Sequence, residues 1–149
     1  MTATSHAVIG TVIAAKIGNP AVAIPIAIAS HLLADIIPHW DTATNRKKKT
    51  LSLFFTHSFV DVAVGLIISL FILNTFFPDT RLLYALLIII AASLPDILTA
   101  PYLFLNWKFR PFTDFYRFSK LFDNKLDNTW GKINQFAIVG LLVILAILL

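Results

Sequence analysis

Long apolar segments limit most strongly what this chain can fold into. Leu51–Phe77 is almost free of charge, and Leu82–Leu105 and Ile133–Leu149 are similarly apolar. A helix needs about 20 apolar residues to cross the roughly 30 Å hydrocarbon core of a bilayer. With 58% hydrophobic residues, 13% charged residues and a mean hydropathy of +0.80, the sequence predicts an all-α, polytopic membrane protein.

A helical hairpin is predicted ahead of these segments. Residues 6–18 are apolar but rise only about 20 Å as a helix, and Asn19-Pro20 is a turn signal. Residues 20–37 are almost uncharged and just long enough to span. The hairpin either crosses twice, with a short or tilted first arm, or is re-entrant. We therefore expect four to five membrane segments in a single domain of 149 residues.

Two polar regions, 42–50 and 106–132, hold most of the positive charge. Because Lys and Arg favour the cytoplasmic side, both regions are expected inside, in the cytoplasmic membrane of a bacterium or archaeon. The net charge of +4 is then a topology signal and a contact with membrane lipids, and nucleic acid is not an expected partner. Aromatic residues at helical spacing in the second region predict a helix lying in the membrane interface: Phe112, Phe115, Tyr116, Phe118, Phe122 and Leu126.

Ionisable side chains interrupt the apolar segments in a pattern that indicates a metal site. His31, Asp35 and His39 are spaced i, i+4 and i+8, which places them on one face of a helix. His57 and Asp61 repeat the i, i+4 spacing in the next segment. Burying such groups is costly unless something pairs them. Both members of a His–Asp pair can bind a metal ion directly. Alternatively, the histidine binds the ion and the carboxylate orients the imidazole by accepting a hydrogen bond from its other ring nitrogen.

With the expected topology, all four histidines and four aspartates fall in the cytoplasmic half of the membrane. The chain has no cysteine, so His, Asp and water must supply the ligands. This set exceeds what one four-coordinate Zn²⁺ needs and suits one or two divalent ions, Zn²⁺ first, with Mn²⁺ or Fe²⁺ also fitting. Asp96 or Asp41 is then the expected general base, and the expected metal ligands are His6, His31, Asp35, His39, His57 and Asp61.

Structural interpretations remain open for some of these residues. His6 lies near the N-terminus, where an ordinary interfacial histidine is common. Asp96 follows Pro95 in a polar interruption at Ser93–Asp96, where it could cap a helix that restarts after a break. Trp40 is better explained as an interfacial anchor than as part of a site.

Four short motifs resemble those of one known family. They are Ser5-His6-Ala7-Val8-Ile9-Gly10, Ile37-Pro38-His39-Trp40-Asp41, Thr56-His57-Ser58 and Leu94-Pro95-Asp96. In order and spacing they resemble the LexA-regulated, membrane-bound family of predicted metal-dependent hydrolases. Where that family carries Pro-Asp-x-Asp-His, this chain reads Pro38-His39-Trp40-Asp41. The resemblance implies a reaction class, metal-dependent hydrolysis, and no particular substrate.

The favoured function is hydrolysis of a lipid or other amphiphilic ester or phosphoester that reaches the metal site from the inner leaflet. The first alternative is a transporter, or a proton or metal-ion pathway, built from the same residues. A pathway should have polar residues across the whole bilayer, and the outer halves offer few. The second alternative is a structural metal, which predicts a closed coordination shell without an adjacent pocket.

Overall fold

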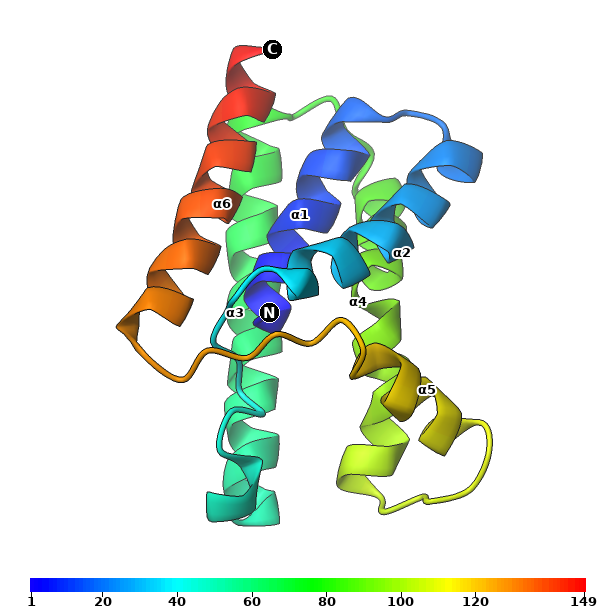
Figure 1. Ribbon diagram of the computed structural model, residues 1–149. Coiled ribbons are helices and arrows are strands. Elements are labelled where there is room, and N and C mark those ends of the chain that lie inside the picture. Colours follow the sequence, from blue (N-terminus) through cyan, green and yellow to red (C-terminus); the bar gives the residue numbers. More distant parts are fainter.

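The computed structural model describes residues 1–149, and its regular structure is helical throughout, as predicted. Five α-helices are joined by short turns or by polar loops, and a sixth, α5, lies within the second polar region (Figure 1). A short 3₁₀ turn, Arg46–Lys48, precedes the third helix. The helices are α1 (Ala3–Lys16), α2 (Pro20–Ile36), α3 (Leu51–Phe76), α4 (Leu82–Phe104), α5 (Phe112–Ser119) and α6 (Thr129–Leu148).

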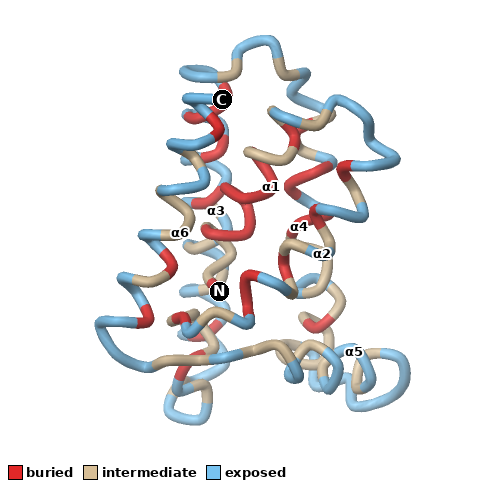
Figure 2. The backbone as a smooth tube through the Cα atoms, turned by 45° about the horizontal axis from the view of Figure 1, so that its top comes forward, coloured by how far each residue is buried: buried red, intermediate tan, exposed pale blue.

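The helices α3, α4 and α6 are long and apolar enough to cross a membrane. Helix α2 is apolar but has 17 residues, and α1 has 14. Three helices therefore meet the length for a crossing, and the expected count of four to five depends on the shorter α1–α2 hairpin. The outer faces of α3 and α6 are largely exposed (Figure 2), and many of the exposed side chains are Leu, Ile, Val and Phe. Such a surface is consistent with a membrane protein.

Helix α1 lies at the centre of the molecule and packs against α2, α3, α4 and α6 (Figure 1). Two glycines permit this close packing. A Cβ atom on Gly10 would lie 2.9 Å from the Cβ of Ala92 on α4, and one on Gly65 of α3 would lie 2.9 Å from the Cα of Thr4. Small residues at such crossings let helix backbones approach closely.

The two ends of the molecule differ in character. The α1–α2 turn and the α3–α4 loop lie together at one end (Figure 1), where the Tyr84 hydroxyl donates a hydrogen bond to the Ile17 carbonyl. The polar segments 37–50 and 105–128 lie toward the other end. The first residues of α1 and the last residues of α2 meet between these ends, so their polar side chains face the polar segments.

Two local predictions need correction. The sequence Ser93–Asp96 does not interrupt its helix, because α4 is continuous with Pro95 and Pro101 inside it. Neighbouring helices and local adjustments can satisfy the backbone groups that a proline frees. The predicted interfacial helix is shorter than its aromatic pattern, since α5 ends at Ser119 and the following residues form a loop.

Candidate metal centre

Three histidines from different segments meet around one carboxylate. His6 of α1, His31 of α2 and His39, which follows α2, are all buried. The Nε2 atoms of His6 and His39 lie 3.3 and 3.8 Å from Oδ1 of Asp35, and the Nε2 atom of His31 lies 3.5 Å from Oδ2. Asp35 therefore lies at the centre of the predicted cluster.

The hydrogen bonds of the histidine rings show which ring nitrogen is free to bind a metal ion. The Nδ1 atom of His31 lies 2.7 Å from the carbonyl oxygen of Ala92, and Nδ1 of His39 lies 2.8 Å from that of Ile37. Because a carbonyl only accepts, each Nδ1 must carry the hydrogen, which leaves a lone pair on Nε2 of the neutral ring. This arrangement is typical of metal-binding histidines, whose second nitrogen donates to a backbone carbonyl.

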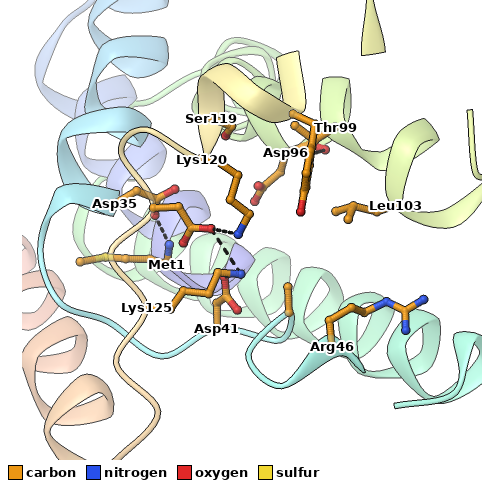
Figure 3. A pocket seen from close by; sticks show the side chains of 13 residues that line it. Met1, Asp35, Asp41, Arg46, Asp96, Thr99, Leu103, Ser119, Lys120 and Lys125 are labelled. Carbon is orange, nitrogen blue, oxygen red and sulfur yellow. Dashed lines mark hydrogen bonds and ion pairs between the residues drawn. The ribbon is translucent and has the colours of Figure 1, made fainter. Parts of the chain in front are cut away.

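The Nε2 atoms of all three histidines are buried and have no hydrogen-bond partner. They face carboxylate oxygens at 3.3 to 4.0 Å, longer than the 2.7–2.9 Å of a typical charge-assisted hydrogen bond. Ligands about 2.1 Å from a tetrahedral ion lie about 3.4 Å from one another. The structure places one cation at this carboxylate, because the buried ammonium group of Met1 donates a hydrogen bond to Oδ1 of Asp35 (Figure 3). The spacing of the imidazole nitrogens and the other carboxylate oxygens fits a metal ion better than a shared proton.

The donors divide into two groups. His6, His31 and Asp96 offer ligand atoms within 4.8 Å of one another. The rings of His6 and His31 stack with centroids 3.7 Å apart, and Oδ1 of Asp96 lies 3.7 Å from Nε2 of His31. This group joins α1, α2 and α4.

The second group consists of His39, Asp41 and Asp123, also within 4.8 Å of one another. Nε2 of His39 lies 4.0 Å from Oδ2 of Asp41 and 3.5 Å from Oδ1 of Asp123. Asp35 is in contact with histidines of both groups. The arrangement can accommodate one cation in each group, with the Asp35 carboxylate between the two groups.

His39 reaches the cluster by a different route from the one its spacing predicts. Helix α2 ends at Ile36, so His39 is not on a helical face with His31. Instead, its backbone N–H donates to the Asn124 carbonyl at 3.1 Å, and its carbonyl accepts from the Leu126 N–H at 2.7 Å. These bonds hold the loop after α5 beside the end of α2.

The same backbone pairing adds Asp123, which lies in the second polar region, 106–132, and outside the expected ligand set. Asn124 donates its backbone N–H to the Asp35 carbonyl at 3.0 Å and its side-chain amide to the Ile36 carbonyl at 3.1 Å. Asp123 is thereby placed 3.5 Å from His39. No local pattern marks this residue, because the pairing joins segments far apart in the chain.

Two lysines border the second group. Lys125 Nζ lies 2.7 Å from Oδ2 of Asp41, and Lys120 Nζ lies 2.6 Å from Oδ2 of Asp123. Burial would raise the pKa of Asp123, but its contacts with His39, Lys120 and Lys125 outweigh burial and hold the pKa well below its usual range. Burial would lower the pKa of Lys125, but Asp41 and Asp123 outweigh it and raise the pKa.

This charge pattern leaves one oxygen of Asp123 free to act as a ligand. The lysines contact Oδ2, whereas Oδ1 is buried without a hydrogen-bond partner and faces His39. The lysines therefore orient the carboxylate and keep it ionised, as groups that hydrogen-bond to a metal ligand commonly do.

The structure does not bring His57 and Asp61 into this cluster. Asp61 of α3 accepts hydrogen bonds from the backbone N–H groups of Ala3 and Thr4 at 2.8 and 3.1 Å, and from the Thr4 hydroxyl at 2.7 Å. It thus closes the N-terminus of α1. His57 is exposed, because α1 begins level with Asp61 and α3 continues past it (Figure 1).

A polar cavity of about 110 Å³ adjoins the cluster and is called the polar chamber below (Figure 3). Both acidic and basic side chains line it, and the side chain of Asp96 is 52% exposed. Its lining includes Asp35, Asp41, Asp96, Asp123, Arg46, Lys120 and Lys125. A small polar group can therefore approach both ligand groups.

No protein-family model, no curated protein and no solved structure matches this chain. The conclusion about function therefore depends on the geometry of the site.

Proposed function

We propose that this protein is a membrane-embedded, metal-dependent hydrolase that acts on a lipid or another amphiphilic ester or phosphoester. One observation carries the proposal: three buried Nε2 atoms without hydrogen bonds face carboxylates, in two groups, at distances that fit ligands of a metal ion. The resemblance to LexA-regulated membrane hydrolases implies the same reaction class. The imidazole and carboxylate donors suit Zn²⁺, and Mn²⁺ or Fe²⁺ would also fit.

The residues divide the work of hydrolysis. A divalent cation held by His6, His31 and Asp35 would make a water more acidic and stabilise charge on the ester oxygens. Asp96 is the best-placed base, because its side chain is half exposed in the polar chamber. The hydroxyl of water then adds to phosphorus or the acyl carbon, the ester bond breaks, and the proton passes to the leaving alcohol. Asp41 is the poorer base because it already pairs with Lys125.

Two features favour this function over the alternatives. Between the cluster and the α1–α2 turn, the core consists mainly of alanine, isoleucine and leucine side chains. The buried polar side chains on α1 and α3 beyond the cluster are the uncharged hydroxyls of Thr11 and Ser69, and Thr11 donates to the Ala7 carbonyl, so this region offers ions few polar groups. The polar chamber beside the cluster also disagrees with a purely structural metal, which would have a closed shell.

Elemental analysis of the purified full-length protein, prepared in detergent without chelators, tests the proposal. We expect one or two equivalents of zinc, manganese or iron per chain, with loss of most of it in His31→Ala. His57→Ala is the matched control, because His57 is exposed outside the cluster and its loss should leave the metal content unchanged. Absence of stoichiometric metal from the wild-type protein, or equal metal in wild type and His31→Ala, would overturn the site.

Activity is measured on the same preparations with a water-soluble phosphodiester and a carboxylic ester. We expect the His57→Ala variant to hydrolyse one of these compounds like the wild type, and Asp96→Asn and His31→Ala to lose activity by about 100-fold or more. A metal-loaded wild-type protein that cleaves neither of them nor any lipid ester would contradict the hydrolase function.

A further inference from the structure

We propose that the substrate is a phosphate-bearing lipid whose acyl chain lies in an apolar cavity between α3 and α4. This inference rests on the hydrolase function proposed above and specifies its substrate class. It follows from a second cavity, from the place where that cavity opens, and from the one unpaired cation beside the metal centre.

The second cavity has a volume of about 330 Å³ and is called the apolar chamber. This volume lies within the range of about 300–1,000 Å³ found for small-molecule sites. Six residues line both chambers: Met1, Asp41, Ala43, Asp96, Thr99 and Leu103. The two chambers thus form one amphipathic space, with its polar end at the His/Asp cluster.

The apolar chamber opens sideways, on the face that α3 and α4 would present to lipid. Helices α3 and α4 pack against α1, which lies between them (Figure 1). The chamber lies beside the beginning of α1, whose residues Ala3 and Ala7 line it. Its lining includes Val62 and Leu66 of α3 and Ile90 and Ile97 of α4, which are 48, 37, 55 and 48% exposed. These side chains belong both to the chamber and to the outer surface.

An acyl chain fits this position better than a protein segment does. Both flanking helices are long and apolar enough to cross a membrane, so lipid chains are the molecules that surround the opening. A lipid that moves sideways into the chamber keeps its chain in apolar surroundings while its ester bond reaches Asp96. Such an entry requires no exposure of the chain to water.

The charges at the polar end favour a phosphate headgroup. Arg46 lines the polar chamber and has no carboxylate partner. Figure 3 shows its guanidinium apart from the aspartates, whereas Lys125 lies beside Asp41. The guanidinium lies 4.6 Å from the ring centre of Phe54, which lines the apolar chamber. A guanidinium at the junction of the two chambers is suited to bind a phosphate next to an acyl chain.

Photo-crosslinking tests the chain position without depending on turnover. The full chain is placed in lipid nanodiscs with phosphatidic acid that carries a diazirine near the middle of one acyl chain. We expect the label on the chamber segments of α3 and α4. Ala100→Trp, at a residue that lines the apolar chamber but not the polar one, should lower this labelling about tenfold, whereas Leu142→Trp on the exposed face of α6 should not.

The headgroup is tested with diacylglycerol that carries the same diazirine. We expect phosphatidic acid to label the chamber about tenfold better in the wild type, and this preference to disappear in Arg46→Ala. Equal labelling by both lipids in the wild type would overturn the phosphate assignment. Labelling of Ala100→Trp at the wild-type level, or labelling spread evenly over α6, would overturn the chain position.

The two proposals fail in different ways. A protein that binds metal and hydrolyses a soluble phosphodiester, but shows no chamber labelling, would keep its proposed function and lose this substrate. A protein without metal whose chamber is still labelled in the expected pattern would lose the hydrolase function and keep the lipid site. Metal analysis of Ala100→Trp shows whether the variant has kept the folded cluster.

Discussion

At the scale of single residues, Asp61 shows a carboxylate that serves the fold rather than the chemistry. It accepts two backbone N–H groups and a hydroxyl at the start of α1. The first N–H groups of a helix have no partner within the helix, and negative charge is favourable there. The carboxylate therefore fixes the end of α1 that carries His6.

Replacement of Asp61 tests this assignment. Asp61→Ala should destabilise the protein by about 2 kcal/mol, because two N–H groups lose a charged acceptor. Asp61→Asn should lose less, since the amide oxygen can still accept. The measurement is thermal unfolding in detergent, together with the metal content of the folded fraction, which we expect to stay at the wild-type level. Loss of metal from Asp61→Ala without loss of stability would instead make Asp61 a ligand.

The residues of the candidate site were predictable to different degrees. His6, His31, Asp35 and Asp96 could be grouped from the sequence because each lies on an apolar helix, where ionisable side chains are rare and depth follows from residue number. The helical spacing of His57 and Asp61 gave a wrong expectation of the cluster, because spacing on α3 does not reveal where α1 begins.

At the scale of helices, the apolar segments predicted the long helices to within a few residues, since length and hydropathy are local properties. Contacts between segments that are far apart in the chain could not be predicted from length and hydropathy. The position of His39 and the recruitment of Asp123 both depend on backbone hydrogen bonds between residues 39 and 124–126. Gly131 allows this close approach, as a Cβ there would lie 3.0 Å from the backbone nitrogen of Trp40.

The crossing of α1 and α4 gives a prediction at the same scale. Gly10→Ala adds a methyl group that would meet the Cβ of Ala92 at 2.9 Å and the Cα of Ile89 at 3.0 Å. The helices must move apart, so we expect a loss of about 1–3 kcal/mol in stability. Ala92 also accepts the hydrogen bond of His31, so the metal affinity should fall as well.

Gly140→Ala provides the matched control for this crossing. Gly140 lies inside α6, and no atom lies within 4 Å of the position of an added Cβ. Replacing a helical glycine by alanine at an open position should be neutral or stabilising by up to about 1 kcal/mol. Thermal unfolding and metal titration of both variants check the prediction, which fails if the two behave alike.

At the scale of the whole molecule, the candidate metal centre joins parts of the chain that are far apart in the sequence. Its donors come from α1, α2, α4, the segment after α2 and the loop after α5. Bound cations would connect the central helix to both polar segments. Without a metal ion, the Met1 ammonium and two lysines compensate part of the carboxylate charge. The lone pairs of the three histidine Nε2 atoms still face carboxylate oxygens in a buried space, where their repulsion is weakly screened.

Removal of the metal should therefore destabilise the entire fold. A ligand that binds only the folded state stabilises it by about 2.7 kcal/mol at 100 times its dissociation constant, which for a chain of this size corresponds to about 5–10 °C in the unfolding midpoint. We expect a chelator to lower the midpoint by this amount, and added Zn²⁺ to restore it. His57→Ala should respond like the wild type, whereas His31→Ala should start from a lower midpoint and respond little. A chelator that strips the metal and leaves the wild-type midpoint unchanged would show that the ion does not hold these segments together.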